Sequence, residues 1–265
     1  MFGFFKKKRR RRLMGRPFPP DWLGFIERNV PYYRHLPPDD RRELQGLIQV
    51  FLAEKQFEGC GGLRLTDEIR ITIAAQACIL LLHRETDFYP NLISILVYPD
   101  IFVAPVHSHD PIGTMSDEVE EYTGESWDRG ALVLSWSDVV EDAADIHDGY
   151  NVVFHEFAHQ LDGESGSDDG APNLPDASMY GSWSRVLGRE YRRLVRDIGR
   201  GRETLLDEYG AEDPAEFFAV ATEFFFEMPV ELKARHPELY AELRKFYRQD
   251  PASFFGPGGG DARED

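Results

Sequence analysis

The run VVFHEFAHQLDGE, residues 152–164, constrains this chain more than any other stretch of its 265 residues. It contains two histidines four positions apart, His155 and His159, with Glu156 beside the first. On an α-helix each residue advances about 100°, so the two imidazoles lie about 40° apart, one turn along, and can reach the same ion. The flanking residues are apolar, which indicates a buried helix. Buried histidines without a ligand would be costly, so the run predicts a zinc-binding helix.

Glu156 has the position of a general base. Its carboxylate can hold the water that a zinc ion polarises and can accept a proton from that water during attack on a carbonyl carbon. The same group can then return a proton to the leaving amine. A zinc ion that only stabilises a fold needs no such base and usually has four protein ligands. The motif therefore favours a hydrolytic site.

The third protein ligand of a catalytic zinc site is missing from the motif. In metzincins, Gly and His occupy the third and sixth positions after the second histidine, and here these positions hold Asp162 and Ser165, which excludes that class. Asp162 continues the face of the two histidines but would have to reach along its own helix. We expect it to orient a histidine or to bind a substrate group. Among the other histidines, His107 and His109 rank highest, because they lie near the end of a predicted strand.

Carboxylates on a later helix are the remaining candidates. The segment Asp213-Pro-Ala-Glu216 begins such a helix with Asp213 as N-cap, and Glu216 has the position of the glutamate in a capping box. Glu223 and Glu227 lie on roughly the same side of this helix, opposite a set of phenylalanines, and this side faces either solvent or a cleft. The residue pattern leaves Glu216 and Glu223 as equal candidates.

Helical periodicity dominates both ends of the chain, and strand signals lie between them. Apolar spacing predicts a helix over 37–57, a buried helix over 66–82, and further helices after the motif. NLISILVYPDIFVAPV, residues 91–106, predicts two short strands or one strand bent at an edge, and GALVLSWSDVV, from Gly130, predicts another shortly before the motif. The sequence therefore predicts a helix-rich α+β fold with a small mixed sheet next to the HExxH helix.

The charge distribution divides the chain. A net charge of −17 argues against nucleic acid as the main partner of the folded part. The basic run Lys6–Arg12 opposes this balance, and no apolar core follows it, so residues 1–20 are not a signal peptide. We expect a flexible, solvated leader whose charge could make weak contact with an anionic surface such as lipid or RNA. Residues 21–252 then form one domain, helical to about residue 90, and 253–265 form a disordered tail.

The location of the protein follows from two further features. No apolar stretch is long enough to span a bilayer, so no transmembrane segment is expected. The two cysteines, Cys60 and Cys78, are too few for a disulfide framework and indicate free thiols in a reducing compartment. We expect a cytoplasmic protein.

Five segments carry a family resemblance: VYPDIFV, GESWDRGALVLSWSDV, HEFAHQLDGESG, DEYGAEDPAEFFAVATEFFFEMP and LRKFYRQDP. In this order, over roughly residues 20–252, they resemble the Mlc titration factor A (MtfA) family of bacterial zinc metallopeptidases. The resemblance implies a gluzincin-type, zincin-like domain with a catalytic core similar to that of anthrax lethal factor. It implies one Zn²⁺ per chain bound by His155, His159 and Glu216, with Glu156 as base. It also implies that Tyr209, seven residues before Glu216, directs its hydroxyl at the oxyanion.

The resemblance also implies substrates and partners. Members of the family have aminopeptidase-like activity and bind the glucose-responsive repressor Mlc, which connects them to the control of sugar uptake. We expect a peptidase whose peptide or protein substrate adds to an edge strand such as Ala131–Ser135. The alternative is a non-catalytic regulatory protein that sequesters such a repressor. An intact Glu156 favours the peptidase, because a structural zinc site needs no base.

Overall fold

The computed structural model describes residues 2–100, 102–105, 119–122, 124–127 and 130–255. Its N-terminal part is helical: α1 (Phe2–Met14), α2 (Pro20–Asn29), the 3-10 helix η1 (Pro31–His35), α3 (Pro38–Glu54) and α4 (Asp67–Ile79). Thr66 caps α4, because its hydroxyl accepts a hydrogen bond from Ile69 N at 3.3 Å. Both helices predicted between residues 37 and 82 are confirmed.

A small sheet follows, with four strands in the order β1-β2-β6-β5. The strands are β1 (Gln56–Gly59), β2 (Ser94–Tyr98), β5 (Gly124–Trp127) and β6 (Ala131–Ser135). β1, β2 and β6 are parallel, and β5 is antiparallel to β6. A separate antiparallel ribbon pairs β3 (Phe102–Pro105) with β4 (Val119–Tyr122). Because β6 has a neighbour on each side, the expectation that Ala131–Ser135 forms an edge is wrong.

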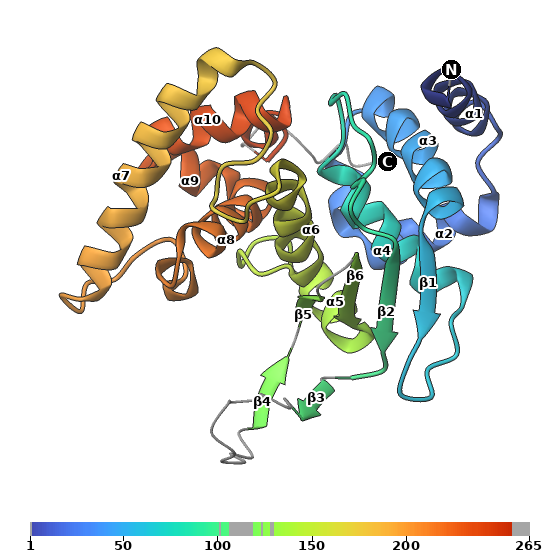
Figure 1. Ribbon diagram of the computed structural model, residues 1–265, viewed down its shortest axis with the longest axis horizontal. Helices are drawn as coiled ribbons and strands as arrows, with labels where there is room; N and C mark the ends of the chain where they lie inside the picture. The colour runs from blue at the N-terminus through green and yellow to red at the C-terminus, as the bar shows by residue number, and fades with distance from the viewer. Residues whose placement is uncertain (1, 101, 106–118, 123, 128–129, 256–265) are drawn as a thin grey trace, which may run out of the picture.

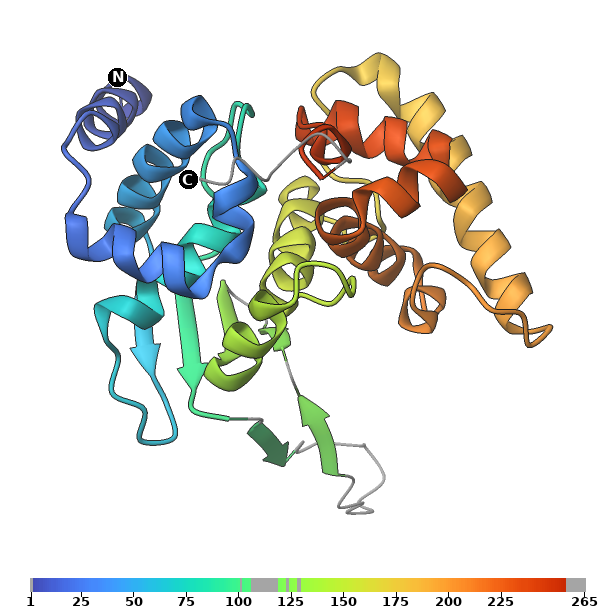
Figure 2. The ribbon, with the colours of Figure 1, turned by 180° about the vertical axis from the view of Figure 1, so that it is seen from behind.

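Helices complete the chain after the sheet. They are α5 (Trp136–Ala144), α6 (Val152–Asp162), α7 (Tyr180–Ile198), α8 (Pro214–Glu227), α9 (Pro229–Arg235) and α10 (Pro237–Tyr247), with the 3-10 helices η2 (Gly163–Ser165), η3 (Ala177–Met179), η4 (Glu208–Ala211) and η5 (Pro251–Ser253). In Figures 1 and 2, α6 lies in the middle of the molecule, between the N-terminal helices and the group α7–α10. The predicted class is confirmed: a helix-rich α+β fold with a small mixed sheet next to the motif helix.

Aromatic packing fixes α6 against α8. The ring of Phe154 on α6 lies 5.3 Å from that of Phe226 on α8 and 6.1 Å from that of Tyr32 in η1, measured between centroids. Four more phenylalanines of α8 are buried: Phe217, Phe218, Phe224 and Phe225. Interiors are packed as densely as organic crystals, so these contacts determine which polar side chains of the two helices meet.

The basic N-terminal segment differs from the expected flexible leader. Residues 2–14 form α1, which packs against α3 with Leu13 buried. Arg10 donates to both carboxylate oxygens of Glu54 (2.9 and 2.6 Å) and to Asp87 Oδ1 (2.6 Å). These partners lie 44 and 77 residues away along the chain, which is why no local pattern indicated the contact.

The start of the expected disordered tail is also packed. The ring of Phe255 stacks on His35 with centroids 4.6 Å apart and lies 5.5 Å from the ring of Tyr32. Residues 256–265 lie outside the described residues. No helix in the described part of the chain combines the length and the apolar character needed to cross a membrane.

Candidate metal centre and active-site cleft

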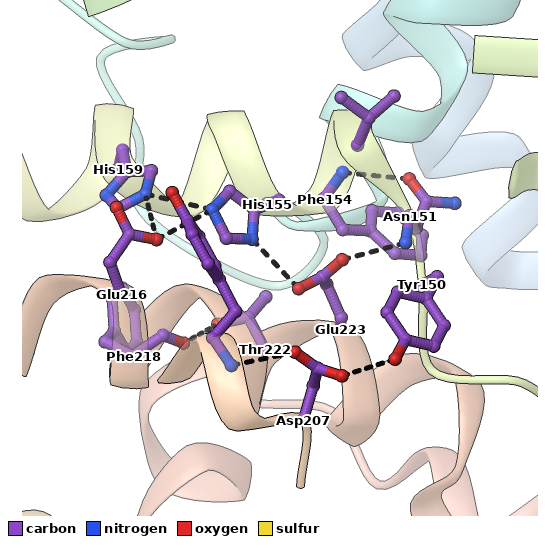
Figure 3. A network of polar contacts seen from close by, with 12 residues as sticks. Tyr150, Asn151, Phe154, His155, His159, Asp207, Glu216, Phe218, Thr222 and Glu223 are labelled. Carbon is purple, nitrogen blue, oxygen red and sulfur yellow. Dashed lines mark hydrogen bonds and ion pairs between the residues drawn. The ribbon is translucent and has the colours of Figure 1, made fainter. Parts of the chain in front are cut away.

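Helix α6 presents both histidines of the motif to α8. Asn151 caps its N-terminus, with Oδ1 accepting a hydrogen bond from Phe154 N at 2.9 Å. The Nε2 atoms of His155 and His159 are 3.2 Å apart. Figure 3 shows both side chains directed from α6 towards α8. The two imidazoles therefore lie close enough to share one ion.

The first turn of α8 supplies a carboxylate to this pair. Asp213 caps α8 through Oδ1, which accepts hydrogen bonds from Ala215 N (2.7 Å) and Glu216 N (3.0 Å). The Glu216 carboxylate reaches α6 instead: its Oε2 lies 3.0 Å from His155 Nε2 and 3.4 Å from His159 Nε2. Ligand atoms of the three residues all lie within 4.8 Å of one another. Two imidazole nitrogens and a carboxylate oxygen form a donor set that fits a divalent metal ion.

Glu223, two turns further along α8, contacts the other nitrogen of His155. Its Oε2 lies 2.9 Å from His155 Nδ1, and its Oε1 accepts a hydrogen bond from Asn151 N at 2.8 Å. A carboxylate that holds a proton on Nδ1 leaves the lone pair on Nε2, which is the nitrogen that faces Glu216. The geometry thus separates the two glutamates that the sequence left equal. The carboxylate of Glu216 contacts both histidines, and Glu223 contacts the opposite edge of the His155 ring, at Nδ1 (Figure 3).

The contact of Glu223 belongs to a buried polar network behind the histidines. Asn151 donates through Nδ2 to Gln76 Oε1 and to Glu227 Oε1, at 3.0 Å each. The network connects α4, the start of α6 and the end of α8. The sequence alone gave no indication of this role of Asn151. An asparagine before a helix indicates a cap, whereas its partners 75 and 76 residues away leave no local signal.

Negative charge predominates around the histidines. Burial would lower the pKa of His155, but the charge of Glu223 and hydrogen bonds with Glu216 and Glu223 raise this pKa well above its ordinary value. Burial would raise the pKa of Glu216, but hydrogen bonds from the two histidines lower it to about 2. The pKa of Glu223 is raised by burial. Surroundings that stabilise a positive charge at this point also stabilise a metal cation.

Glu156 and Tyr209 line the space beside the histidines. Glu156 is 5% exposed, burial raises the pKa of its carboxyl, and no other described residue donates a hydrogen bond to that carboxylate. The ring of Tyr209, in η4, lies 5.8 Å from the ring of His155. Partial burial and the charge of Glu216 raise the pKa of Tyr209 to about 12, so its hydroxyl stays protonated at neutral pH. One group can accept a proton and the other can donate a hydrogen bond.

Asp207 holds the turn that carries Tyr209. Its Oδ1 accepts a hydrogen bond from Tyr209 N at 2.8 Å, and its Oδ2 accepts one from the hydroxyl of Tyr150. Tyr150 comes just before α6, so this pair connects η4 to the start of the motif helix (Figure 3). Neither Asp207 nor Tyr150 was predicted from the sequence to have this role.

His155 faces a cleft of about 580 Å³ between α5, α6, η4 and α8. Carboxylates dominate its lining: Asp138, Glu141, Asp142, Asp148, Glu156, Asp207 and Glu223. Among the described residues that line it, none is Lys or Arg. Low-dielectric walls of one charge concentrate ligands of the opposite charge, so this cleft suits cationic groups.

Asp162 is the one further sequence candidate from the motif helix, and its contacts differ from the expected ones. Asp162 is fully buried, and its Oδ2 accepts a hydrogen bond from Gly170 N at 2.7 Å, whereas its Oδ1 has no hydrogen-bond partner among the described residues. The expectation that Asp162 orients a histidine is therefore wrong, and Glu223 makes that contact instead. Asp162 fixes the loop after α6. His107 and His109 lie outside the described residues.

A histidine pair on one helix, joined by a glutamate from a second helix beside a cleft, is an arrangement characteristic of metallopeptidases. The chain belongs to the family described as glucose-regulated metallo-peptidase M90, whose profile matches residues 4–248. The family resemblance is thereby confirmed. The match begins inside α1, so the basic helix is part of the family region rather than an appended leader.

Individual relatives agree with this assignment. The chain is 36% identical to Mlc titration factor A of Serratia proteamaculans over 222 residues, which cover 82% of this chain and 84% of the relative. It is 34% identical to Mlc titration factor A of Klebsiella pneumoniae (strain 342) over 225 residues, 84% of each chain. An uncharacterized protein of Synechocystis sp. is 44% identical over 245 residues, 92% of this chain and 89% of the relative.

Proposed function

We propose that this protein is a zinc-dependent peptidase in which His155, His159 and Glu216 bind the ion. The observation that carries the proposal is the convergence of these three side chains beside a cleft that His155 and Glu156 line. A structural zinc site is usually closed by a fourth protein ligand and needs neither a base nor a cleft. Membership of a metallopeptidase family supports the same conclusion.

The groups of the chain have distinct roles in the proposed reaction. When bound, zinc supplies a polarised water with a pKa of about 7. Glu156 accepts a proton from this water and later returns a proton to the leaving amine. The protonated hydroxyl of Tyr209 donates to the oxygen on which negative charge develops. Glu223 keeps His155 in the orientation that exposes its Nε2 lone pair.

The acidic cleft supports substrates that carry a positive charge close to the scissile bond. A protonated amino terminus is such a group, and seven carboxylates without a Lys or Arg among the described lining residues would attract it. Aminopeptidase-like activity is therefore the form of peptide hydrolysis that we propose.

The names of the relatives favour a second function. Two of them are called Mlc titration factor A, so we propose that this chain also binds a Mlc-like repressor and takes part in regulating sugar-uptake genes. Repressor binding needs no general base, and both functions can occur in one protein. The alternative, a regulatory protein without catalysis, would make Glu156 dispensable.

The substitution Glu156→Gln tests the peptidase. It keeps the size of the buried side chain, so bound zinc should be unchanged, while hydrolysis of amino-acid anilides should fall by about 10²–10⁴-fold. The matched control is Glu231→Gln on α9, an exposed carboxylate outside the cleft, which should leave both unchanged. Full hydrolysis by the Glu156 variant would rule out Glu156 as the base, whereas absence of hydrolysis by the unmodified protein would favour the regulatory alternative.

A further inference from the structure

The outward face of α1 carries two exposed aromatic side chains. Phe4 is 71% exposed and Phe5 is 62% exposed, the highest values among the large hydrophobic side chains of the described residues. Their rings are 6.1 Å apart, in the first turns of the helix. Two neighbouring phenylalanines in water lose hydrophobic free energy unless something covers them, so they indicate a contact surface.

A cluster of cations follows these phenylalanines. Lys7, Lys8, Arg11 and Arg12 are exposed, and none forms an ion pair with a described residue. At about 100° per residue, Phe4, Lys8, Arg11 and Arg12 lie within one half of the helix surface. The whole chain has a net charge of −17, so this face is a local positive patch on an acidic protein.

The opposite face of α1 is fixed to the body of the protein. Arg10 and Leu13 are buried there, and the guanidinium of Arg10 lies 4.6 Å from the ring centroid of Phe88 while pairing with Glu54 and Asp87. Lys6 adds a contact to Asp87 at 2.8 Å. The helix thus holds its cations and phenylalanines in a constant orientation, directed away from the rest of the molecule.

We propose that α1 docks this protein onto an anionic lipid bilayer. α1 lies at the outer edge of the molecule in both Figure 1 and Figure 2, where a flat surface can approach it. The cations contact lipid phosphates and carboxylates, and Phe4 and Phe5 enter the headgroup boundary. Single-stranded RNA fits less well, because its binding sites usually interleave aromatic groups with cations along a groove. Here both phenylalanines precede the cations, on a convex helix.

The experiment is sedimentation of the full chain with vesicles of phosphatidylcholine alone or mixed with phosphatidylserine. We expect binding only to the mixed vesicles, weakened by added salt. Each basic residue contributes about fivefold to such binding, so the triple variant Lys8→Gln, Arg11→Gln, Arg12→Gln should bind about a hundredfold more weakly. The double variant Phe4→Ser, Phe5→Ser should bind about tenfold more weakly and keep its salt dependence.

A matched control removes the same charge from α7 and the turn that follows it, where Arg192, Arg196 and Arg200 are exposed. Their triple replacement by Gln should leave vesicle binding unchanged, and unchanged melting temperatures should accompany all variants because Arg10 and Leu13 remain. Equal loss of binding in both triple variants would overturn the proposal, because the affinity for the mixed vesicles would then depend on the total charge of the protein rather than on α1. So would absence of binding to the mixed vesicles. Tighter binding of a single-stranded RNA oligonucleotide than of these vesicles would assign α1 to nucleic acid and also overturn it.

Discussion

Two buried histidine–glutamate pairs in this protein have the same local geometry. In the cleft, His155 Nδ1 lies 2.9 Å from Glu223 Oε2. Between α7 and the start of α10, His236 Nδ1 lies 2.9 Å from Glu190 Oε2. Each pair joins two helices, and each glutamate is 6% exposed. The distance between the partners therefore does not distinguish a functional pair from a structural one.

The charges around the two pairs differ. Arg189 and Arg193 lie 2.9 and 3.5 Å from the carboxylate of Glu190, and the hydrogen bond from His236 is the main cause that lowers the pKa of Glu190 to about 2. No basic side chain other than His155 contacts Glu223 among the described residues, and burial raises its pKa. The His236–Glu190 pair is therefore neutralised by its arginine neighbours.

The His155–Glu223 pair retains an excess of negative charge. Nε2 of His155 lies 3.0 Å from the carboxylate of Glu216. His236 has no comparable second carboxylate among the described residues. Buried charges without partners are costly, so the site around His155 gains most from a bound cation. A carboxylate whose charge is not neutralised by a nearby arginine or lysine, rather than the histidine–glutamate contact itself, therefore distinguishes the metal site.

The largest expected effect breaks the site around His155. Glu216→Ala removes the only carboxylate that lies within 4 Å of the Nε2 atoms of both histidines in the described structure, so zinc affinity should fall by two orders of magnitude or more. Competition with a chromophoric chelator measures this affinity. Glu190→Gln, at the other pair, is the control and should bind zinc like the unmodified protein. Unchanged affinity in the Glu216 variant would exclude it as a ligand.

A smaller effect is expected for Glu223→Gln. Glutamine keeps the size of the side chain, but its single carbonyl oxygen cannot accept from both His155 Nδ1 and Asn151 N. Zinc affinity should fall by about 10–100-fold, as for other residues that orient metal-binding histidines. The same chelator competition applies, and the loss should be smaller than for Glu216→Ala. A loss as large as that one would mean that Glu223 itself binds the ion.

These two glutamates also show how far the sequence alone can go. The positions of His155 and His159 follow from helical periodicity, and Asp213 and Asn151 are recognisable caps, so both helices could be placed. Glu216 and Glu223 differ by seven residues and share one face of α8, which is why spacing could not choose between them. The choice depends on which part of α8 crosses α6, and this is set by aromatic packing between distant segments.

The same limit explains the basic segment. The sequence of the run Lys6–Arg12 indicates a solvated segment, because nothing within it shows that Arg10 contacts Glu54 and Asp87. Asp162 shows the converse. Its spacing from the histidines was suitable for a contact. However, the loop after α6 turns back at Gly170, whose backbone N–H donates a hydrogen bond to the Asp162 carboxylate. Long-range contacts, which a single sequence does not display, decided both cases.

Glu190→Gln, at the His236–Glu190 pair, should have the smallest effect on zinc affinity and the clearest effect on the stability of the fold. The pKa of Glu190 is lowered to about 2 in the folded protein, so its ion pairs stabilise the fold above the ordinary carboxyl pKa of about 4.3 and lose this contribution as pH falls towards 2. Glu190→Gln should therefore lower the free energy of unfolding by about 1–3 kcal/mol at neutral pH. The difference from the unmodified protein should shrink between about pH 4 and pH 2. Urea unfolding at several pH values measures it, and a difference that does not vary with pH would show that the charge of Glu190 contributes nothing.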